Sequence, residues 1–237
     1  MTPRVVVSFV LAALLTASCA PSQPDSPEQP PVSSTPDAAE SATSEPDPGP
    51  SQPLGQTLEE DVELARTLAE RYWEGVFQSS GRTYRPLTRF EAYSGSDGPD
   101  CGGQPAVPEN AFYCPVGHFV AYDRQWLQSL YDEKGDGAVY VIIPHEIGHA
   151  VQAQLMSDFT LNRDRELQAD CYAGVALKGI IDAGQLQAED GDEEELLTNL
   201  AAAGDPTDAW WRPDAHGTPV ARQQAFARGY NDGIDAC

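Results

Sequence analysis

The stretch VIIPHEIGHAVQ, residues 141–152, carries two histidines four residues apart, with Glu146 directly after the first. Residues i and i+4 of a helix share a face, so His145 and His149 can offer two imidazole nitrogens to one ion. Glu146 lies about 100° around the helix from His145, so its carboxylate can reach a water at that ion without being a ligand. The alternative interpretation is an amphipathic helix that happens to carry two histidines.

A second segment, RELQADCYAG, contains residues that could complete such a site. The pattern H-E-x-x-H is typical of zinc peptidases, and a catalytic zinc usually has three protein ligands and one open position. Glu166 follows His149 in this segment, and Asp170 lies four residues further on. We predict Glu166 as the third ligand and Asp170 as the hydrogen-bond acceptor for the second nitrogen of a ligand histidine. The competing interpretation is a solvated acidic edge.

Several segments, kept in order, resemble the bacterial putative neutral zinc metallopeptidase family from about residue 58 to residue 237. The resemblance implies a gluzincin-like fold, one Zn²⁺ held by His145, His149 and Glu166, and Glu146 as the catalytic base. It also implies paired cysteines within the domain. The segments are GDGAVYVIIPHEIGHAVQ, RELQADCYAG, AAAGD and HGTPVARQQAFARGYNDG, with CG at 101–102 and FYCP at 112–115.

The chain departs from the family pattern at Pro144 and His118. A proline inside a helix leaves a carbonyl unpaired, here that of Tyr140, and kinks the helix at a cost of about 3 kcal/mol. His145, Glu146 and His149 follow the proline, so we expect their mutual geometry to survive. We assign no role to His118.

Periodicity and capping residues predict a mainly helical α+β fold with a small β-sheet. Thr57-Leu58-Glu59-Glu60 has the form of a capping box and predicts a helix over about 58–78. Residues 82–123 are expected to be loops with a small sheet, including the runs 111–114 and 119–122. Further helices are expected from Asp136 through the H-E-x-x-H motif, over about 164–183, after a second capping box at 192–195 as far as Gly204, and from Thr218-Pro219 towards Cys237.

Four cysteines lie in the expected domain: Cys101, Cys114, Cys171 and Cys237. An even number in an exported domain favours disulfides, and no pair has the C-x-x-C spacing that would favour zinc thiolates. Cys101 and Cys114 are close in the loop-rich region, whereas Cys171 lies on the Glu166 helix and Cys237 ends the last helix. We predict the pairs Cys101–Cys114 and Cys171–Cys237.

The N-terminal part predicts export and lipid anchoring. Arg4 followed by the apolar run Val5–Leu15 fits a signal peptide over residues 1–18. Small residues precede Cys19, which resembles a lipobox, so we expect lipidation of Cys19; an ordinary secretory signal is the alternative. Ten of residues 20–53 are proline and none is aromatic, so residues 19–57 are expected to be a disordered acidic tether to a domain over 58–237. The expected location is the outer face of the bacterial cytoplasmic membrane or the cell surface.

The formal net charge of −23 argues against binding to nucleic acids or to anionic lipid surfaces, which require clusters of Lys and Arg. We therefore expect no nucleic-acid partner, and the zinc-peptidase motif implies a protein or peptide substrate. His216 is a candidate stabiliser of the oxyanion formed during peptide hydrolysis, or else a local packing residue. Trp210 and Trp211 are expected to anchor the core, with a substrate platform as the alternative. A zinc-retaining binding or scaffold lipoprotein and an amidase acting on cell-wall peptides remain as alternative functions.

Overall fold

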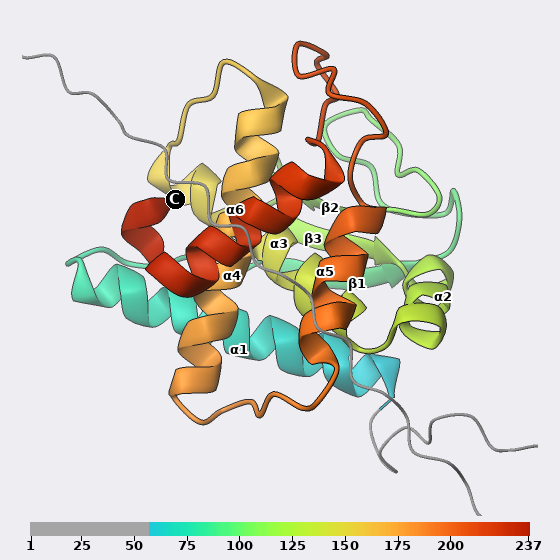
Figure 1. The fold of residues 1–237 in the computed structure, drawn as a ribbon. Helices are drawn as coiled ribbons and strands as arrows, with labels where there is room; N and C mark the ends of the chain where they lie inside the picture. Colours follow the sequence, from blue (N-terminus) through green and yellow to red (C-terminus); the bar gives the residue numbers. More distant parts are fainter. Residues whose placement is uncertain (1–56) are drawn as a thin grey trace, which may run out of the picture. The chain divides into compact units, whose positions relative to one another are not determined.

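The computed structural model describes residues 57–237, so the predicted signal peptide, Cys19 and nearly all of the predicted tether lie outside the described residues. The described part is an α+β fold that is mainly helical and holds one small sheet (Figure 1). None of its helices is both long and apolar enough to cross a membrane. Its elements are α1 (Leu58–Ser79), β1 (Arg89–Tyr93), β2 (Ala111–Cys114), β3 (Phe119–Asp123), α2 (Arg124–Lys134), α3 (Gly137–Leu155), α4 (Asn162–Asp182), α5 (Asp192–Ala202), α6 (Pro219–Asp232) and a 3₁₀ turn (Ile234–Ala236).

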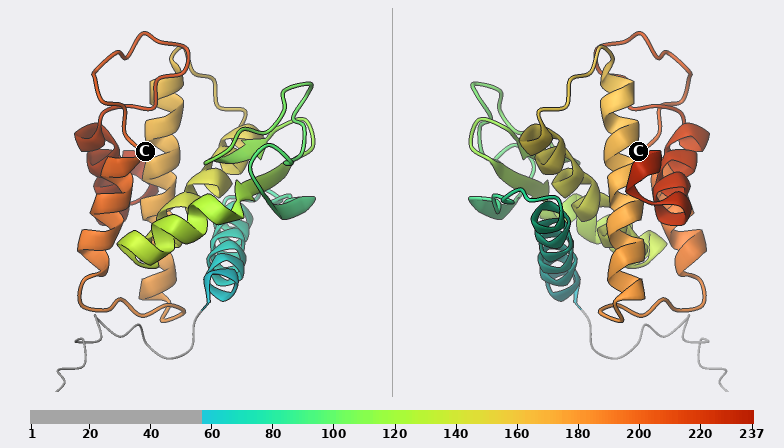
Figure 2. Two further views of the ribbon diagram at one scale, coloured as in Figure 1. Left: turned by 90° about the vertical axis from the view of Figure 1, so that its right-hand side faces the viewer. Right: turned by 90° about the vertical axis from the view of Figure 1, so that its left-hand side faces the viewer.

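Helix α3 is the centre of the core. Its side chains are buried almost without interruption from Gly137 to Gln152, as is typical of a helix that is surrounded by other elements. It contacts α1, α2, α4, α5 and the strands β2 and β3. In Figure 2 the sheet lies on one side of α3 and α4, and α5 and α6 lie on the other. The motif that opened the sequence analysis therefore lies on the most enclosed helix of the described chain.

The sheet has the strand order β1-β3-β2, in which β1 is parallel and β2 antiparallel to β3. All five residues of β3 are buried, as expected for the central strand. The runs predicted at 111–114 and 119–122 are β2 and β3, so that prediction is confirmed. Strand β1 was not predicted.

Two close approaches between helices depend on glycine. A Cβ atom at Gly148 would lie only 3.0 Å from the carbonyl oxygen of Ala169, so this glycine lets α3 approach α4. A Cβ atom at Gly174 would overlap the carbonyl of Phe226, and one at Gly229 would overlap the carbonyl of Cys171. These contacts set the spacing of α3, α4 and α6, the helices that carry the candidate site.

Both predicted disulfides are present. Cys101–Cys114 joins the loop before β2 to the end of that strand, with a Cα–Cα distance of 5.6 Å. Cys171–Cys237 joins α4 to the last residue, with a Cα–Cα distance of 5.7 Å. The second bond holds the segment after α6 against the helix that carries Glu166.

The helix starts are predicted correctly where a side chain caps the helix. Thr57 and Glu60 form the predicted capping box of α1, and the Thr218 side chain caps α6 with Pro219 at its first position. Helix α3 runs continuously through the buried Pro144. The predicted kink there stays a prediction.

Three predictions about the fold are wrong. The N-cap of α5 is Gly191, and no capping box forms at Asp192, because Glu195 instead accepts a hydrogen bond from the backbone N–H of Gly137 at 3.2 Å. The last helix ends at Asp232, where Gly233 has a φ of 81° that ends the helical geometry. Trp210 and Trp211 are 45% and 65% exposed, so they do not anchor the core.

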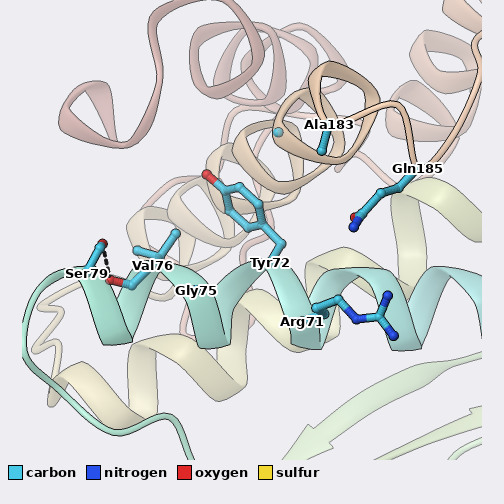
Figure 3. A pocket seen from close by; sticks show the side chains of 8 residues that line it. Arg71, Tyr72, Gly75, Val76, Ser79, Ala183 and Gln185 are labelled. Carbon is cyan, nitrogen blue, oxygen red and sulfur yellow. Dashed lines mark hydrogen bonds between the residues drawn. The ribbon is translucent and has the colours of Figure 1, made fainter.

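A shallow groove of about 340 Å³ lies between α1 and the end of α4 (Figure 3). Tyr72 and Arg71 line it from α1, and Gln185 lines it from the segment after α4. None of the predicted site residues lines this groove.

Candidate metal centre

The three predicted ligands meet where α3 and α4 face each other. One turn of α3 separates His145 from His149, and the centroids of their rings are 4.7 Å apart. Glu166 lies near the start of α4 and is 4% exposed. One donor atom of each of the three side chains lies within 4.8 Å of the other two. This is the only group of three or more His, Cys, Asp or Glu side chains with that geometry among residues 57–237.

The orientation of both rings is set by partners on the side away from Glu166. Nδ1 of His145 lies 2.8 Å from Oδ1 of Asp170, and Nδ1 of His149 lies 2.8 Å from Oε1 of Gln152. Both partners are acceptors, so each imidazole donates from Nδ1 and turns its Nε2 towards Glu166. The two Nε2 atoms lie 3.2 and 3.4 Å from the same Glu166 oxygen, Oε2.

Gln152 and Asp170 are themselves held by further groups. The side-chain amide of Gln152 donates to the carbonyl of Arg165 at 2.8 Å and to Oε1 of Gln168 at 3.1 Å, which fixes its oxygen towards His149. Asp170 is fully buried and accepts two hydrogen bonds from Arg222 of α6. The motif reasoning missed Gln152 and Arg222. The position of Gln152 three residues after His149 could have indicated the first, and nothing in the local sequence indicates the second.

The charges at the site stabilise one another. Burial opposes a charge on Glu166, but hydrogen bonds to His145 and His149 outweigh it and hold the pKa of the Glu166 carboxyl far below its usual range. Burial is likewise outweighed for Asp170, whose pKa is lowered by Arg222 and His145. For His145, burial favours the neutral ring, yet Asp170 and Glu166 raise its pKa to about 10. A metal that binds Nε2 must displace this proton, so metal binding is coupled to proton release.

Glu146 is placed differently from the other carboxylates. It is 7% exposed, and its side chain makes no hydrogen bond or ion pair with any of residues 57–237. Its carboxylate oxygens have no partner, yet they are not among the fully enclosed unpaired side-chain atoms of the described residues, so a water or a substrate can reach them. On the helix Glu146 is next to His145 but does not belong to the group of converging donors.

The donor set fits zinc. Two imidazole nitrogens and one carboxylate oxygen are a known ligand set of catalytic zinc, and three protein ligands leave a position open. Nε2 of His145, Nε2 of His149 and Oε2 of Glu166 would hold the ion. The other Glu166 oxygen, Oε1, accepts a hydrogen bond from Arg165 at 2.9 Å, which favours a single ligating oxygen.

His216 lies outside this cluster of contacts. Its side chain is half exposed, with Nδ1 3.7 Å from Oδ1 of Asp205, and its backbone N–H donates to the same carboxylate at 2.7 Å. These contacts show local packing, while the oxyanion role stays a prediction. His118 is buried and bonds to Tyr113 and to the carbonyl of Arg85.

Comparisons with known proteins agree with this site. A family model described as "Putative neutral zinc metallopeptidase" matches residues 32–237. "Uncharacterized protein YpfJ" of Escherichia coli strain K12 is 33% identical over a 200-residue alignment, and the match covers 74% of this chain and 68% of the relative. "Uncharacterized protein Rv2575" of Mycobacterium tuberculosis strain H37Rv is 32% identical over a 182-residue alignment, and the match covers 63% of this chain and 60% of the relative. No solved structure matches the chain. With a family model that covers most of its length, the chain belongs to the putative neutral zinc metallopeptidase family.

Proposed function

We propose that the chain is a zinc-dependent peptidase in which Glu146 is the general base. The observation that carries this proposal is the contrast among the side chains at one point of α3 and α4. Both histidines have Nδ1 bonded to an acceptor and Nε2 directed at Glu166, whereas the adjacent Glu146 has no partner within the described residues. Two histidines from one helix and a glutamate from the next support a gluzincin-like arrangement.

Each residue has a separate task in this proposal. His145, His149 and Glu166 bind one zinc ion per chain. Bound zinc supplies Lewis acidity, which polarises the scissile carbonyl and lowers the pKa of a water to about 7. Glu146 takes the proton of the attacking water and passes it to the departing amine nitrogen.

The two glutamates provide the test. Glu146→Gln should retain about one zinc per chain while peptide hydrolysis falls by a factor on the order of 10² or more. Glu166→Ala should lose zinc affinity and hydrolysis together. Glu194→Gln, the same change at an exposed position of α5, is the control and should alter neither. Metal analysis and turnover of a denatured-protein substrate are measured on the same preparations.

Two outcomes would contradict the proposal. If Glu146→Gln loses zinc, or if Glu166→Ala keeps both zinc and activity, these roles are assigned wrongly. If the parent binds zinc firmly but cleaves neither proteins nor purified cell wall, the chain is a zinc-retaining binding or scaffold protein. Cleavage of cell wall alone would identify an amidase acting on cell-wall peptides.

We further propose that the protein is exported and anchored to the membrane by a lipid on Cys19. The two disulfides of the described part support export, because such bonds form and persist in oxidising compartments. Mass analysis of the mature N-terminus and membrane partitioning of a Cys19→Ala variant test this. A mature chain that begins elsewhere, or a variant that stays on the membrane, would overturn it.

A further inference from the structure

Arg222 reaches the metal centre from the last helix of the chain. It is 5% exposed and lies 77 residues after His145 in the sequence. Its Nε donates to Oδ2 of Asp170 at 2.8 Å, and its Nη2 donates to Oδ1 at 2.7 Å. Its Nη1 donates to the carbonyl of Ala203, just beyond α5, at 2.8 Å. The guanidinium is thus held at three points and grips both oxygens of one carboxylate.

Arg222 binds the carboxylate of Asp170, which orients His145, the first of the proposed ligands. Oδ1 of Asp170 accepts from both Nη2 of Arg222 and Nδ1 of His145. Rotation of this carboxylate would break the bond to Nδ1 and turn Nε2 away from Glu166. A bidentate guanidinium–carboxylate pair has a defined plane as well as a defined distance, so Arg222 removes that rotation.

Charge provides a second reason for Arg222 at this position. Glu146, Glu166 and Asp170 place three carboxylates in one buried region, and Zn²⁺ would balance two of them. Arg222 is the only Lys or Arg among the buried polar residues of the described chain. Its single positive charge balances the third carboxylate among the buried groups, where an unbalanced charge is strongly unfavourable. Arg165 pairs with Glu166 from the exposed side.

We propose that Arg222 is a positioning residue of the zinc site, which acts through Asp170 on the geometry of His145 and so sets the affinity for the metal. The proposal rests on the proposed zinc site, and it goes beyond it by making α6 part of that site. The close packing of Gly174 and Gly229 against the facing backbones brings α6 near enough for this contact.

A residue with a purely structural role could also form a buried ion pair. The test therefore measures zinc affinity separately from stability. Arg222→Gln should lower zinc affinity about 10–100-fold, as outer-shell partners of ligand histidines do. Arg222→Lys keeps the charge but cannot bind both oxygens in one plane, so its zinc affinity should lie between those of the parent and Arg222→Gln. Zinc affinity is measured by competition with a chromophoric chelator, and stability by denaturant unfolding of the same variants in EDTA.

Asp61→Asn is the matched control. Asp61 is also fully buried and joins helices, through hydrogen bonds from Tyr131 at 2.7 Å and Tyr140 at 3.2 Å, but it has no contact with the metal ligands. It should lower stability and leave zinc affinity unchanged. If Arg222→Gln behaves in the same way, Arg222 is structural only and the proposal is overturned.

A double variant tests whether Arg222 acts through Asp170. If it does, Arg222→Gln combined with Asp170→Asn should bind zinc about as weakly as Asp170→Asn alone, since the two changes break one chain of contacts. Losses that multiply would overturn the proposal. A parent that binds zinc without cleaving peptides would overturn the proposed peptidase and leave this inference standing. A parent that binds no zinc would overturn both.

Discussion

The two ends of α3 both gather carboxylates, but in opposite electrostatic settings. At the C-terminal half, Glu166 and Asp170 face His145, His149 and Arg222, and the pKa values of both carboxyls are lowered. At the N-terminal end, Asp136 lies among other acids. Burial raises the pKa of Asp136 to about 6, with further contributions from Asp61, Glu195 and Asp192. Asp61 is hydrogen-bonded only to tyrosines there, and Glu195 accepts a backbone bond.

This difference shows that a cluster of acids is not by itself a metal site. In the N-terminal cluster, Asp61 and Glu195 accept hydrogen bonds from hydroxyl and backbone donors. The pKa of Asp136 is raised, so this carboxyl holds its proton more tightly. The carboxylates of the C-terminal cluster pair with imidazoles and a guanidinium, and one donor atom of each of His145, His149 and Glu166 lies near a common point. Only the second arrangement offers nitrogen ligands, which zinc prefers.

The largest effect should come from the metal itself. Zinc at about 1,000 times its dissociation constant should stabilise the folded chain by about 4 kcal/mol, because only the folded chain has the assembled site. Calorimetry with and without EDTA checks this. Calcium serves as the comparison, because it prefers oxygen ligands and should add little. Equal stabilisation by calcium would mean that the acidic N-terminal end binds cations, and the contrast between the two ends would fail.

Loss of the Cys171–Cys237 disulfide should have the next largest effect. It closes a loop of 66 residues, and the other disulfide closes one of 13. By loop entropy, the paired alanine variants should lose about 4 and about 3 kcal/mol of unfolding free energy, respectively. Only the Cys171→Ala, Cys237→Ala variant should also bind zinc more weakly, since it loosens the segment that follows Arg222. Equal zinc affinities in the two variants would show that the position of α6 does not affect the candidate metal site.

A smaller effect is expected at Gln152, the uncharged hydrogen-bond partner of His149. Gln152→Leu removes the acceptor of His149 Nδ1 and should lower zinc affinity about 10-fold, the lower end of the range for such partners. Gln154→Leu is the matched control two residues along α3, since its side chain instead accepts from the backbone N–H of Arg85 at 2.7 Å. Competition titrations of both variants decide the matter. Similar losses in both would show that packing, and not orientation of His149, is responsible.

The last expected effect is a dependence of stability on pH at Asp136. Its folded pKa of about 6 is above its ordinary value of 3.8, so its ionised form destabilises the fold above pH 6 and this loss is recovered as the pH falls towards 3.8. In EDTA, Asp136→Asn should therefore be more stable than the parent at pH 7.5, by a margin that shrinks at pH 5. Asp208→Asn, at an exposed position, should show no such trend. If the difference in stability between Asp136→Asn and the parent is constant with pH, ionisation of Asp136 does not destabilise the fold. The electrostatic contrast between the two ends of α3 would then fail.

The sequence predicts the proposed metal ligands better than it predicts the residues that hold them in position. His145, His149 and Glu166 stand at regular spacing on helices, and helical periodicity is enough to bring such residues together. Arg222 and Asp170 are 52 residues apart, and their pairing depends on how closely α6 packs against α4, which no local pattern encodes.

The errors at the fold level have two different origins. Helix α2 was missed, although Asp123 before it caps the helix by accepting from the N–H of Gln125 at 3.1 Å. The predicted capping box of α5 fails because Glu195 bonds to the start of α3 and Asp192 accepts from the N–H of Glu189. For α5 a tertiary contact decides what a short motif leaves open, whereas α2 begins at a local cap.

The position of Arg222 on α6 has a consequence for the order in which the protein becomes complete. Chains are synthesised from the N-terminus, so the three ligands and Glu146 emerge well before residue 222. Until α6 follows, Asp170 lacks the cation that pairs with it, and the disulfide that needs Cys237 cannot close. A nascent or truncated chain therefore carries the whole H-E-x-x-H motif and Glu166 before residues 222–237 complete the candidate metal site.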